Sequence, residues 1–404
     1  MNICILSFQT HLCGSLGGVS THVHELSSIF VSLGHRVSVI CPAHYQYPDI
    51  DYIEIIDNVL FYCIGGTSCR TLDHHWRYKS KRVFAELHER LRFHSVFFEG
   101  ITHRDIFDEI KKSGIPYFGF LHNFALTHFY NVFKEIYNFR GLVHYFSYTV
   151  PHLIHKAVSV EIPFFRSCTS ILSASLHNAE RIKKFYRIKQ DKVAVIPNWV
   201  DTDKFTPSPE LRRAGRRRWH CPDCKIIFLF VGSLYFPKGL HIAIRSFGRL
   251  LDSDVDACLL VAGSGRHEKK LKDLAHKVGL IEGNSICFLG PVRHSLLPLL
   301  FNAADIFLMP SLFIEVLPYS LLEAMSCELP FISTTNAGCK EAMGDVGISI
   351  RPSSTNAMTD AMIYLARNVE ERIRIGRLAR NRVREMFSRQ VAIDKIDRLL
   401  MSIC

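Results

Sequence analysis

The feature that most constrains the fold is a regular alternation of short apolar runs with helix-like segments. The chain opens with the run ICILSF, which is followed by a loop of small residues and by a helical pattern that ends at Gly34. Later runs are HRVSVICP, FHSVFFEG, IPYFGFLHN and CTSILSAS. Strands that alternate with helices form a parallel, doubly wound sheet, so the first half of the chain predicts an α/β domain.

The same alternation restarts after the segment KVAVIPNWVDTDKF and predicts a second α/β unit. Its apolar runs include KIIFLFVGSL, ACLLVAGSG, SICFLGPV, ADIFLMPS, LPFISTT and VGISI, and the tail from Ser353 has helical spacing. A length of 404 residues also favours two or three domains. We place the hinge near residues 198–222. Two such domains would present the carboxyl ends of both sheets to one cleft, where open α/β sheets bind ligands.

Composition and cysteine usage predict a cytoplasmic protein. The chain is 48% hydrophobic and 22% charged, yet no apolar run reaches the roughly 18 to 20 residues of a spanning helix. The start MNICILSFQT has no basic region followed by a cleavable apolar segment. The 13 cysteines are scattered singly, as reduced core thiols would be. The close pair Cys221 and Cys224 lacks two further zinc ligands, so we expect no metal there.

The net charge of +11 calls for an anionic partner: nucleic acid, phospholipid head groups or a diphosphate substrate. The basic run RRAGRRRW at 212–219 is typical of a solvated connecting segment, and no nucleic-acid recognition motif accompanies it. We therefore expect no nucleic-acid partner. The stretch 129–156 mixes aromatic and basic residues. It is interpreted either as a core helix pair, which is favoured, or as a peripheral contact with an anionic membrane.

Glu315 and Glu323 lie eight positions apart in the segment FIEVLPYSLLEAM. Proline is tolerated at the start of a helix and not deeper, so Pro318 places Glu315 in a loop and Glu323 about one turn inside the helix. The N-terminus of that helix offers backbone N–H groups to a phosphate, and each carboxylate can accept hydrogen bonds from sugar or ribose hydroxyls. The alternative is an ordinary amphipathic helix with solvated acids.

This pair of glutamates, with the following AMSCELPFISTTNAGCKE, resembles the retaining "group 1", family-four-like glycosyltransferases. The resemblance runs from Met1 to about Phe387, with several blocks in the right order. It implies a GT-B fold of two Rossmann-like domains facing a cleft, with an N-terminal acceptor-side domain at 1–198 and a C-terminal donor-side domain at 199–387. It also implies that a helix at 388–404 crosses back to the first domain. The substrate would be a nucleotide-diphosphate sugar, without a further cofactor or a metal.

In the C-terminal half, the block VGSLYFPKGLHIAIRSF places Lys238 and Gly239 at a strand-to-helix turn, where a lysine can hold a diphosphate. The family usually has an arginine where Ser233 stands. The resemblance further implies that Glu315 binds the hydroxyls of the donor sugar and that Glu323 binds the ribose. The remaining donor-binding residues that it implies are Val292, His294, Val316 and Leu317.

In the N-terminal half, Gly17 and Gly18 lie between the first strand and the first helix, where glycine lets a ligand approach the backbone. His122 ends the run IPYFGFLHN, at the position of the family's histidine that faces the donor sugar. On their own, the glycines would more often mark a turn and the histidine would more often be a structural hydrogen-bonding group. The string Asp201-Thr202-Asp203 lies in the linker, so we interpret it as turn chemistry and not as a metal site.

The resemblance implies that His122, Lys238 and Glu315 form the catalytic group of a retaining glycosyltransferase. Its acceptor would be a saccharide or a lipid-linked saccharide in cell-surface polysaccharide or glycolipid synthesis, reached from the cytoplasm, with possible contact at the inner face of the membrane. Two alternatives stay open. One is a sugar-nucleotide epimerase on the same fold, and the other is a non-catalytic nucleotide-sugar binding protein.

Overall fold

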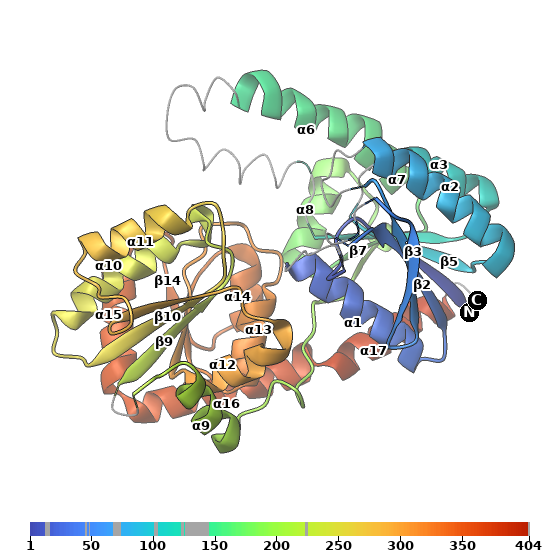
Figure 1. The fold of residues 1–404 in the computed structure, drawn as a ribbon. Helices are drawn as coiled ribbons and strands as arrows, with labels where there is room; N and C mark the ends of the chain where they lie inside the picture. Colours follow the sequence, from blue (N-terminus) through green and yellow to red (C-terminus); the bar gives the residue numbers. More distant parts are fainter. Residues whose placement is uncertain are drawn as a thin grey trace. The chain divides into compact units, whose positions relative to one another are not determined.

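The computed structural model describes residues 1–12, 17–44, 47, 49–67, 74–100, 104–122, 125, 145–222 and 225–402. The chain divides into two compact α/β units (Figure 1). Unit 1 comprises Met1–Pro197 together with Ile393–Cys404, and unit 2 comprises Asn198–Ala392. Each unit contains its own sheet with helices packed on both faces, as the alternation of apolar runs and helical segments predicts.

Unit 1 is built on an eight-stranded sheet with the strand order β3-β4-β2-β1-β5-β6-β7-β8. Its strands are β1 (Asn2–Ser7), β2 (Arg36–Pro42), β3 (Tyr52–Ile56), β4 (Val59–Ile64), β5 (Ser95–Glu99), β6 (Tyr117–Leu121), β7 (Ser170–Ser173) and β8 (Val193–Val195). Its helices are α1 (Gly18–Ser32), α2 (His74–Leu91), α3 (Arg104–Ser113), α6 (Val150–Lys156), α7 (Ile162–Ser167) and α8 (Leu176–Tyr186). Short π-helical turns, Tyr145–Thr149 and Ala157–Glu161, flank α6.

This largely parallel sheet has one antiparallel pair at its edge, which the alternation of apolar runs and helical segments does not predict. Strands β3 and β4 pair antiparallel and form a hairpin whose two-residue turn is Asp57-Asn58. Both turn residues have positive φ, 51° and 62°, as a type I′ hairpin turn requires. Aspartate and asparagine tolerate that conformation better than other non-glycine residues do. The two exposed side chains of β3, Ile53 and Ile55, mark it as an edge strand.

Unit 2 is built on a six-stranded sheet, all parallel, with the order β11-β10-β9-β12-β13-β14. Its strands are β9 (Ile226–Val231), β10 (Ala257–Ala262), β11 (Ile286–Gly290), β12 (Ile306–Met309), β13 (Phe331–Thr334) and β14 (Ile348–Ile350). Its helices are α9 (Pro209–Arg218), α10 (Leu240–Leu251), α11 (Glu268–Lys277), α12 (Leu297–Ala303), α13 (Tyr319–Ser326), α14 (Ala337–Met343), α15 (Thr355–Arg367) and α16 (Val369–Met386). The last helix, α17 (Arg389–Met401), begins in unit 2 and continues into the residues that group with unit 1.

Burial on both faces explains why the strands of unit 2 are continuous apolar runs. Along β9, Ile227 and Leu229 join the core cluster that includes α12, α13 and α16, whereas Phe228 and Phe230 join the cluster that includes α10, α11 and α15. Successive side chains of a strand point to opposite faces, so one strand serves both cores. Figure 1 shows the two helical layers on either side of this sheet.

The prediction that the basic run at 212–219 is a solvated connecting segment is wrong. Most of it forms α9, and two of its arginines bind Asp305, the residue that precedes β12. Arg212 Nη2 lies 2.5 Å from Asp305 Oδ1, and the buried Arg216 donates to Oδ2 at 2.7 Å. The backbone N–H of Ile227 donates to the same carboxylate at 2.8 Å. The run therefore anchors α9 to the start of two strands.

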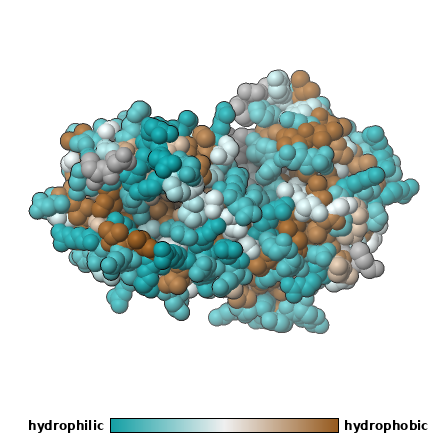
Figure 2. All heavy atoms as spheres, turned by 90° about the horizontal axis from the view of Figure 1, so that it is seen from below, coloured by the Kyte–Doolittle hydropathy of each residue, from teal (hydrophilic) through white to brown (hydrophobic). Residues whose placement is uncertain are grey.

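The described cysteines are free thiols, and all of them except Cys287 are buried, as the sequence predicts for core residues. Cys224, the sequence neighbour of Cys221 in the predicted close pair, lies outside the described residues. Among the described residues no helix has the length and apolarity needed to cross a membrane. Figure 2 shows one face of the molecule, on which hydrophilic residues predominate and hydrophobic ones form scattered groups.

Candidate functional site

Each sheet has one point at which the strand order reverses. In unit 2 the chain leaves β9 for its neighbour β10 and later returns to the other side of β9 with β12. In unit 1 the chain leaves β1 for β2 and later returns with β5 on the other side. Open α/β sheets bind ligands beyond the carboxyl ends of the strands at such a switch point. The candidate ligand-binding residues are therefore those that follow β9 and β12 in unit 2 and those that follow β1 and β5 in unit 1.

In unit 2 a lysine and a glutamate meet at the switch point. Lys238 ends the short 3₁₀ turn Phe236–Lys238 after β9, and Glu315 lies in the loop after β12. The Nζ atom of Lys238 donates to Oε1 of Glu315 at 2.8 Å, and the hydroxyl of Ser311 donates to the same oxygen at 2.7 Å. The two side chains of the ion pair are 25% and 13% exposed, so both are accessible from solvent while being held in place.

Two glycines allow this arrangement because the backbone passes close to them. Gly239 has φ of +80°, and a Cβ atom there would lie 1.9 Å from the carbonyl oxygen of Pro310. At Gly338 a Cβ atom would lie 2.1 Å from the carbonyl oxygen of Val316. The N–H of Gly338 also donates to the carbonyl of Glu315 at 3.0 Å. The loop that carries Glu315 is thus fixed by contacts that only glycine permits.

The second glutamate is paired with a histidine. The helix α13 begins directly after Pro318, as the sequence predicts, and Glu323 lies on its buried side with 5% of its side chain exposed. The Oε1 atom of Glu323 lies 2.9 Å from Nε2 of His294, and Lys204 Nζ lies 3.4 Å from Nδ1 of that ring. Because an ammonium only donates, Nδ1 accepts and Nε2 carries the hydrogen that Glu323 receives.

The other residues predicted for unit 2 occupy the same edge of the sheet. Val292 follows β11 and packs against the core, and Val316 lies between Glu315 and the buried Leu317. The carbonyl of Leu317 accepts a hydrogen bond from Asn198 at 2.7 Å. Ser233, which follows β9, is exposed.

Arg266 is a cationic residue at this edge that the sequence did not single out. It follows β10, the neighbour of β9, and its guanidinium lies 4.2 Å from the centre of the Tyr235 ring. It also donates to the Tyr235 hydroxyl at 2.6 Å. The Tyr235 ring stacks on Phe313, and Lys238 Nζ lies 5.7 Å from the centre of the Phe313 ring. Two aromatic rings therefore connect the two cations.

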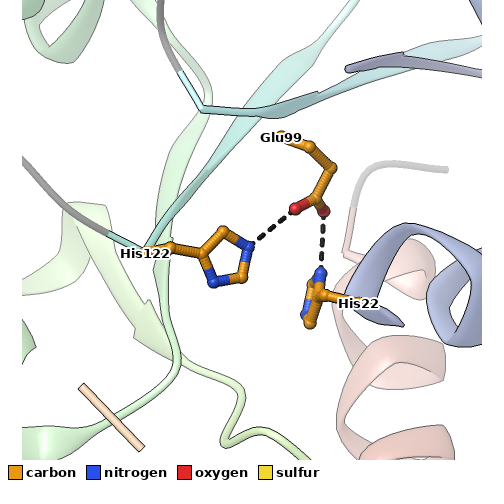
Figure 3. Close-up of side chains that lie close together, drawn as sticks. All are labelled: His22, Glu99 and His122. Atoms are coloured by element: carbon orange, nitrogen blue, oxygen red, sulfur yellow. Dashed lines mark hydrogen bonds and ion pairs between the residues drawn. The ribbon is translucent and has the colours of Figure 1, made fainter. Parts of the chain in front are cut away.

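In unit 1 the predicted His122 belongs to a buried group of three side chains (Figure 3). Glu99 ends β5, His122 directly follows the adjacent strand β6, and His22 comes from the buried side of α1. Nε2 of His122 lies 2.8 Å from Oε2 of Glu99, and Nδ1 of His22 lies 3.0 Å from Oε1. His22 and Glu99 are completely buried, whereas 14% of the His122 side chain is exposed.

The electrostatics of this group favour an ionised glutamate between two N–H donors. Burial raises the pKa of Glu99, but interaction with His22 and hydrogen bonds from both imidazoles outweigh it, so the pKa is lowered overall. Burial lowers the pKa of His22. The lowered pKa therefore favours an ionised Glu99 carboxylate that accepts a hydrogen bond at each oxygen.

Among the described residues, these three side chains are the only group of histidine, cysteine, aspartate and glutamate whose ligand atoms could surround a metal ion; the atoms lie within 4.8 Å of one another. A metal would need the nitrogen lone pairs. Here each of the two nitrogens faces a separate oxygen of one carboxylate, at 3.0 Å for His22 and 2.8 Å for His122, where it can donate a hydrogen bond to that oxygen.

The remaining predicted residues have simpler surroundings. Gly17 and Gly18 are exposed at the start of α1, and neither has positive φ. Asp201 Oδ1 accepts from the backbone N–H groups of Asp203 and Lys204, at 3.0 Å each. This confirms that the Asp201-Thr202-Asp203 string makes a turn.

Comparison with solved structures agrees with this architecture. The fold is similar to that of sucrose-phosphate synthase from Thermosynechococcus elongatus, with a TM-score of 0.80 and 15% identity over 100% of this chain and 98% of that one. It is also similar to HepE from Anabaena in complex with UDP-glucose, with a TM-score of 0.75 and 16% identity over the whole of both chains. Two doubly wound units with these neighbours define the GT-B class of fold.

Family comparisons then place the chain within that class. Residues 16–204 match the family described as Glycosyltransferase Family 4, and residues 212–382 match Glycosyl transferases group 1. The chain belongs to this group 1, family-four-like family of glycosyltransferases.

One curated relative is the GDP-mannose-dependent monoacylated alpha-(1-6)-phosphatidylinositol monomannoside mannosyltransferase of Corynebacterium glutamicum. It is 28% identical over 215 residues, which are 51% of this chain and 55% of the relative. The chain spans about half the length of the first curated relatives that it matches.

Proposed function

We propose that this chain is a glycosyltransferase that takes a sugar from a nucleotide-diphosphate donor and transfers it with retention of the anomeric configuration. The observation that carries the proposal is the pairing of Lys238 with Glu315 across the switch point of unit 2. It places a cation and a sugar-binding carboxylate where an α/β sheet receives a nucleotide. The family match of residues 212–382 covers both residues.

In this proposal unit 2 binds the donor. Lys238 and the backbone N–H groups at the start of α13 stabilise the diphosphate, whose negative charge grows as the glycosidic bond breaks. Glu315 accepts hydrogen bonds from sugar hydroxyls, and Glu323, oriented by His294, accepts them from the ribose. Gly239, Val292, Val316 and Leu317 contribute backbone and apolar contacts with the donor.

Arg266 supplies a second cation for the diphosphate. Glu315 already neutralises part of the charge of Lys238, and Ser233 brings no charge of its own. Arg266 follows the strand next to β9, and Tyr235 orients its guanidinium through a stacking contact and a hydrogen bond. A guanidinium binds phosphate oxygens in a fixed fork geometry, which suits it to this task.

The reaction needs no protein nucleophile in this scheme. The acceptor hydroxyl attacks the anomeric carbon on the face from which the diphosphate leaves, the bond between that carbon and the diphosphate oxygen breaks, and the departing oxygen takes the hydroxyl proton. His122 contacts a sugar hydroxyl, and Gly17 and Gly18 leave room for substrate beside α1. The protein contributes positioning and electrostatic stabilisation, without a metal or a further cofactor.

The acceptor in this proposal is a saccharide or a lipid-linked saccharide in cell-surface polysaccharide or glycolipid synthesis. The corynebacterial relative is by its name a mannosyltransferase that acts on a phosphatidylinositol mannoside, which supports an acceptor of this kind. HepE was crystallised with UDP-glucose, which supports a nucleotide-sugar donor.

The test is an assay of nucleotide sugars with and without saccharide and glycolipid acceptors, with products analysed by NMR. We expect a donor-dependent product whose new linkage has the anomeric configuration of the donor sugar. An inverted linkage would refute retention. An altered sugar nucleotide formed without acceptor would show an epimerase, and donor binding without any turnover would show a non-catalytic binding protein.

We further propose that unit 1 contacts an anionic membrane from the cytoplasmic side. Much of the predicted stretch, residues 129–144, lies outside the described residues. Of the rest, Phe146, Tyr148 and Ile154 are each more than half exposed, and no acidic residue occurs between 145 and 160. The protein should pellet with anionic liposomes at low salt and be released at high salt. Equal binding to neutral and anionic vesicles, or to neither, would refute membrane contact.

A further inference from the structure

The group formed by His22, Glu99 and His122 contains two residues that the proposed reaction does not use directly. Glu99 is a charged side chain with no exposure, at the carboxyl end of a central strand. Burying a carboxylate is costly unless its oxygens are hydrogen-bonded, and both oxygens of Glu99 accept from an imidazole. This arrangement lies at the carboxyl end of the sheet, where Glu99 is hydrogen-bonded to His122, the residue predicted to contact the sugar.

The hydrogen-bonding capacity of the three groups determines where the hydrogens are. An ionised carboxylate only accepts, so Nε2 of His122 and Nδ1 of His22 must both carry hydrogen. When the His122 imidazole is neutral it carries one hydrogen in all, which leaves its Nδ1 atom as an acceptor. Figure 3 shows that this second nitrogen is turned away from Glu99. The 14% exposure of the His122 side chain makes the ring accessible to a ligand.

Contacts between aromatic rings hold the two imidazoles in place, in addition to their hydrogen bonds. The His22 and His122 rings are 4.7 Å apart at an angle of 75°, and His22 lies edge-on to Phe120 with a separation of 4.5 Å. His22 thus supports the His122 ring from one side and anchors Glu99 through the other carboxylate oxygen. The pair His22 and Glu99 spans the switch point of unit 1, since α1 follows β1 and Glu99 ends β5.

We infer that Glu99, anchored by His22, is a positioning residue that fixes His122 as the Nε2–H tautomer and so presents Nδ1 as a hydrogen-bond acceptor to a hydroxyl of the substrate sugar. A partner that orients a functional imidazole in this way is known to matter about 10- to 100-fold at metal-bound histidines, and we expect an effect of similar size on turnover. This inference deepens the proposed function and rests on it for its kinetic part.

The sharpest variant is Glu99→Gln, which keeps the size of the side chain and changes its hydrogen-bonding pattern. An amide has one acceptor oxygen and one donor nitrogen, so it can accept from only one of the two imidazoles. The other ring must then turn a lone pair towards the amide and switch tautomer. We expect kcat to fall about 10- to 100-fold, with the KM for the donor changed less than about threefold. The matched control is Glu86→Gln, because Glu86 is an exposed residue of α2 in the same unit.

A double-mutant cycle separates positioning from a structural effect. If Glu99 acts through His122, Glu99→Gln should cost little more once His122→Ala has been introduced. Equal losses in both backgrounds would overturn the inference. Thermal unfolding of each variant identifies those that fail to fold, and in that case His22→Asn, which weakens only the anchor, takes the place of Glu99→Gln.

A measurement that needs no activity keeps this inference separate from the proposed function. The ¹⁵N chemical shifts of the neutral His122 ring report its tautomer directly. We expect Nε2–H at His122 in the wild type, and a changed tautomer of His122 in Glu99→Gln if kcat falls as predicted; an unchanged His122 tautomer together with that fall would overturn the inference. Nδ1–H at His122 in the wild type would overturn the inference, whether or not the protein transfers sugars. Titration with Zn²⁺ alone completes the test: stoichiometric binding abolished by Glu99→Gln would show a metal site and overturn it too.

Discussion

Lys238 and Glu315 follow neighbouring strands of unit 2, β9 and β12, and lie 2.8 Å apart between Nζ and Oε1, at the point where the strand order of the sheet reverses. The ion pair and the hydrogen bond from Ser311 hold both side chains in place while each remains partly exposed. A donor diphosphate would compete with Glu315 for the ammonium, and the sugar hydroxyls would then satisfy the carboxylate. Binding of the donor therefore exchanges one set of charge-assisted hydrogen bonds for another.

The first prediction concerns these two residues. Lys238→Ala removes the charge that stabilises the leaving diphosphate, and Glu315→Gln removes the anionic acceptor for the sugar hydroxyls. We expect kcat/KM for sugar transfer to fall about 100-fold or more in each variant. Asp203→Ala is the control, because that residue forms part of a turn. Wild-type activity in Lys238→Ala would show that another group stabilises the diphosphate.

A second prediction concerns Arg266. If its guanidinium binds the diphosphate, Arg266→Ala should weaken donor binding about tenfold, which corresponds to the loss of one charge-assisted hydrogen bond. Tyr235→Phe removes only the hydroxyl that orients the guanidinium and should have a smaller effect. Calorimetric titration with the donor measures both. Lys270→Ala is the control for an exposed positive charge nearby, and an equal effect there would refute a specific role for Arg266.

A third prediction concerns the stability of unit 2. Asp305→Ala leaves the buried Arg216 without its carboxylate and should lower the free energy of unfolding by about 3–5 kcal/mol. Urea unfolding followed by circular dichroism measures it. The control is Arg213→Ala, which breaks the solvent-exposed pair with Glu210 and should leave the free energy of unfolding nearly unchanged. Similar losses in both variants would contradict an anchoring role for α9.

A fourth prediction follows from the lowered pKa of the buried His22. In the unfolded chain this histidine takes up a proton near its ordinary pKa of 6.5, but the folded protein resists protonation. The unfolded state thus binds more protons than the folded state just below pH 6.5. The contribution of His22 to the free energy of unfolding is therefore fully present above that pH and is lost as the pH falls below it. His22→Asn should reduce the dependence of the unfolding free energy on pH between about 5 and 6.5. An unchanged slope would contradict this assignment.

Local sequence signals predicted much of the fold and the start of the helix that carries Glu323. Pro318 marked the start of α13, and the apolar runs marked the strands, because these signals lie within a few residues of one another. The hairpin of β3 and β4 was missed although Asp57-Asn58 is a recognisable turn signal. The basic run at 212–219 was misinterpreted because its partner, Asp305, lies 93 residues from Arg212 in the sequence.

The group around His122 shows what a single sequence does not reveal. His22 and Glu99 are 77 residues apart, and neither belongs to a motif that the sequence analysis recognised. Only the order of the strands brings the end of β5 next to β1 and β6 and so places Glu99 beside both histidines. The one sequence signal for this group was Glu99 itself, an acid at the end of the apolar run SVFFE. A charge at the end of a buried strand needs a hydrogen-bonding partner.

The most direct test of the central claim is calorimetric titration of the protein with nucleotide-sugar donors in the presence of EDTA and, separately, of Mg²⁺. Unit 2 is proposed to hold the diphosphate with Lys238, Arg266 and the start of α13, without a metal. We predict the same dissociation constant for a donor under both conditions in the wild type, and at least tenfold weaker binding in Lys238→Ala. Donor binding that disappears in EDTA and returns with Mg²⁺, or that is unaffected by Lys238→Ala, would contradict the account.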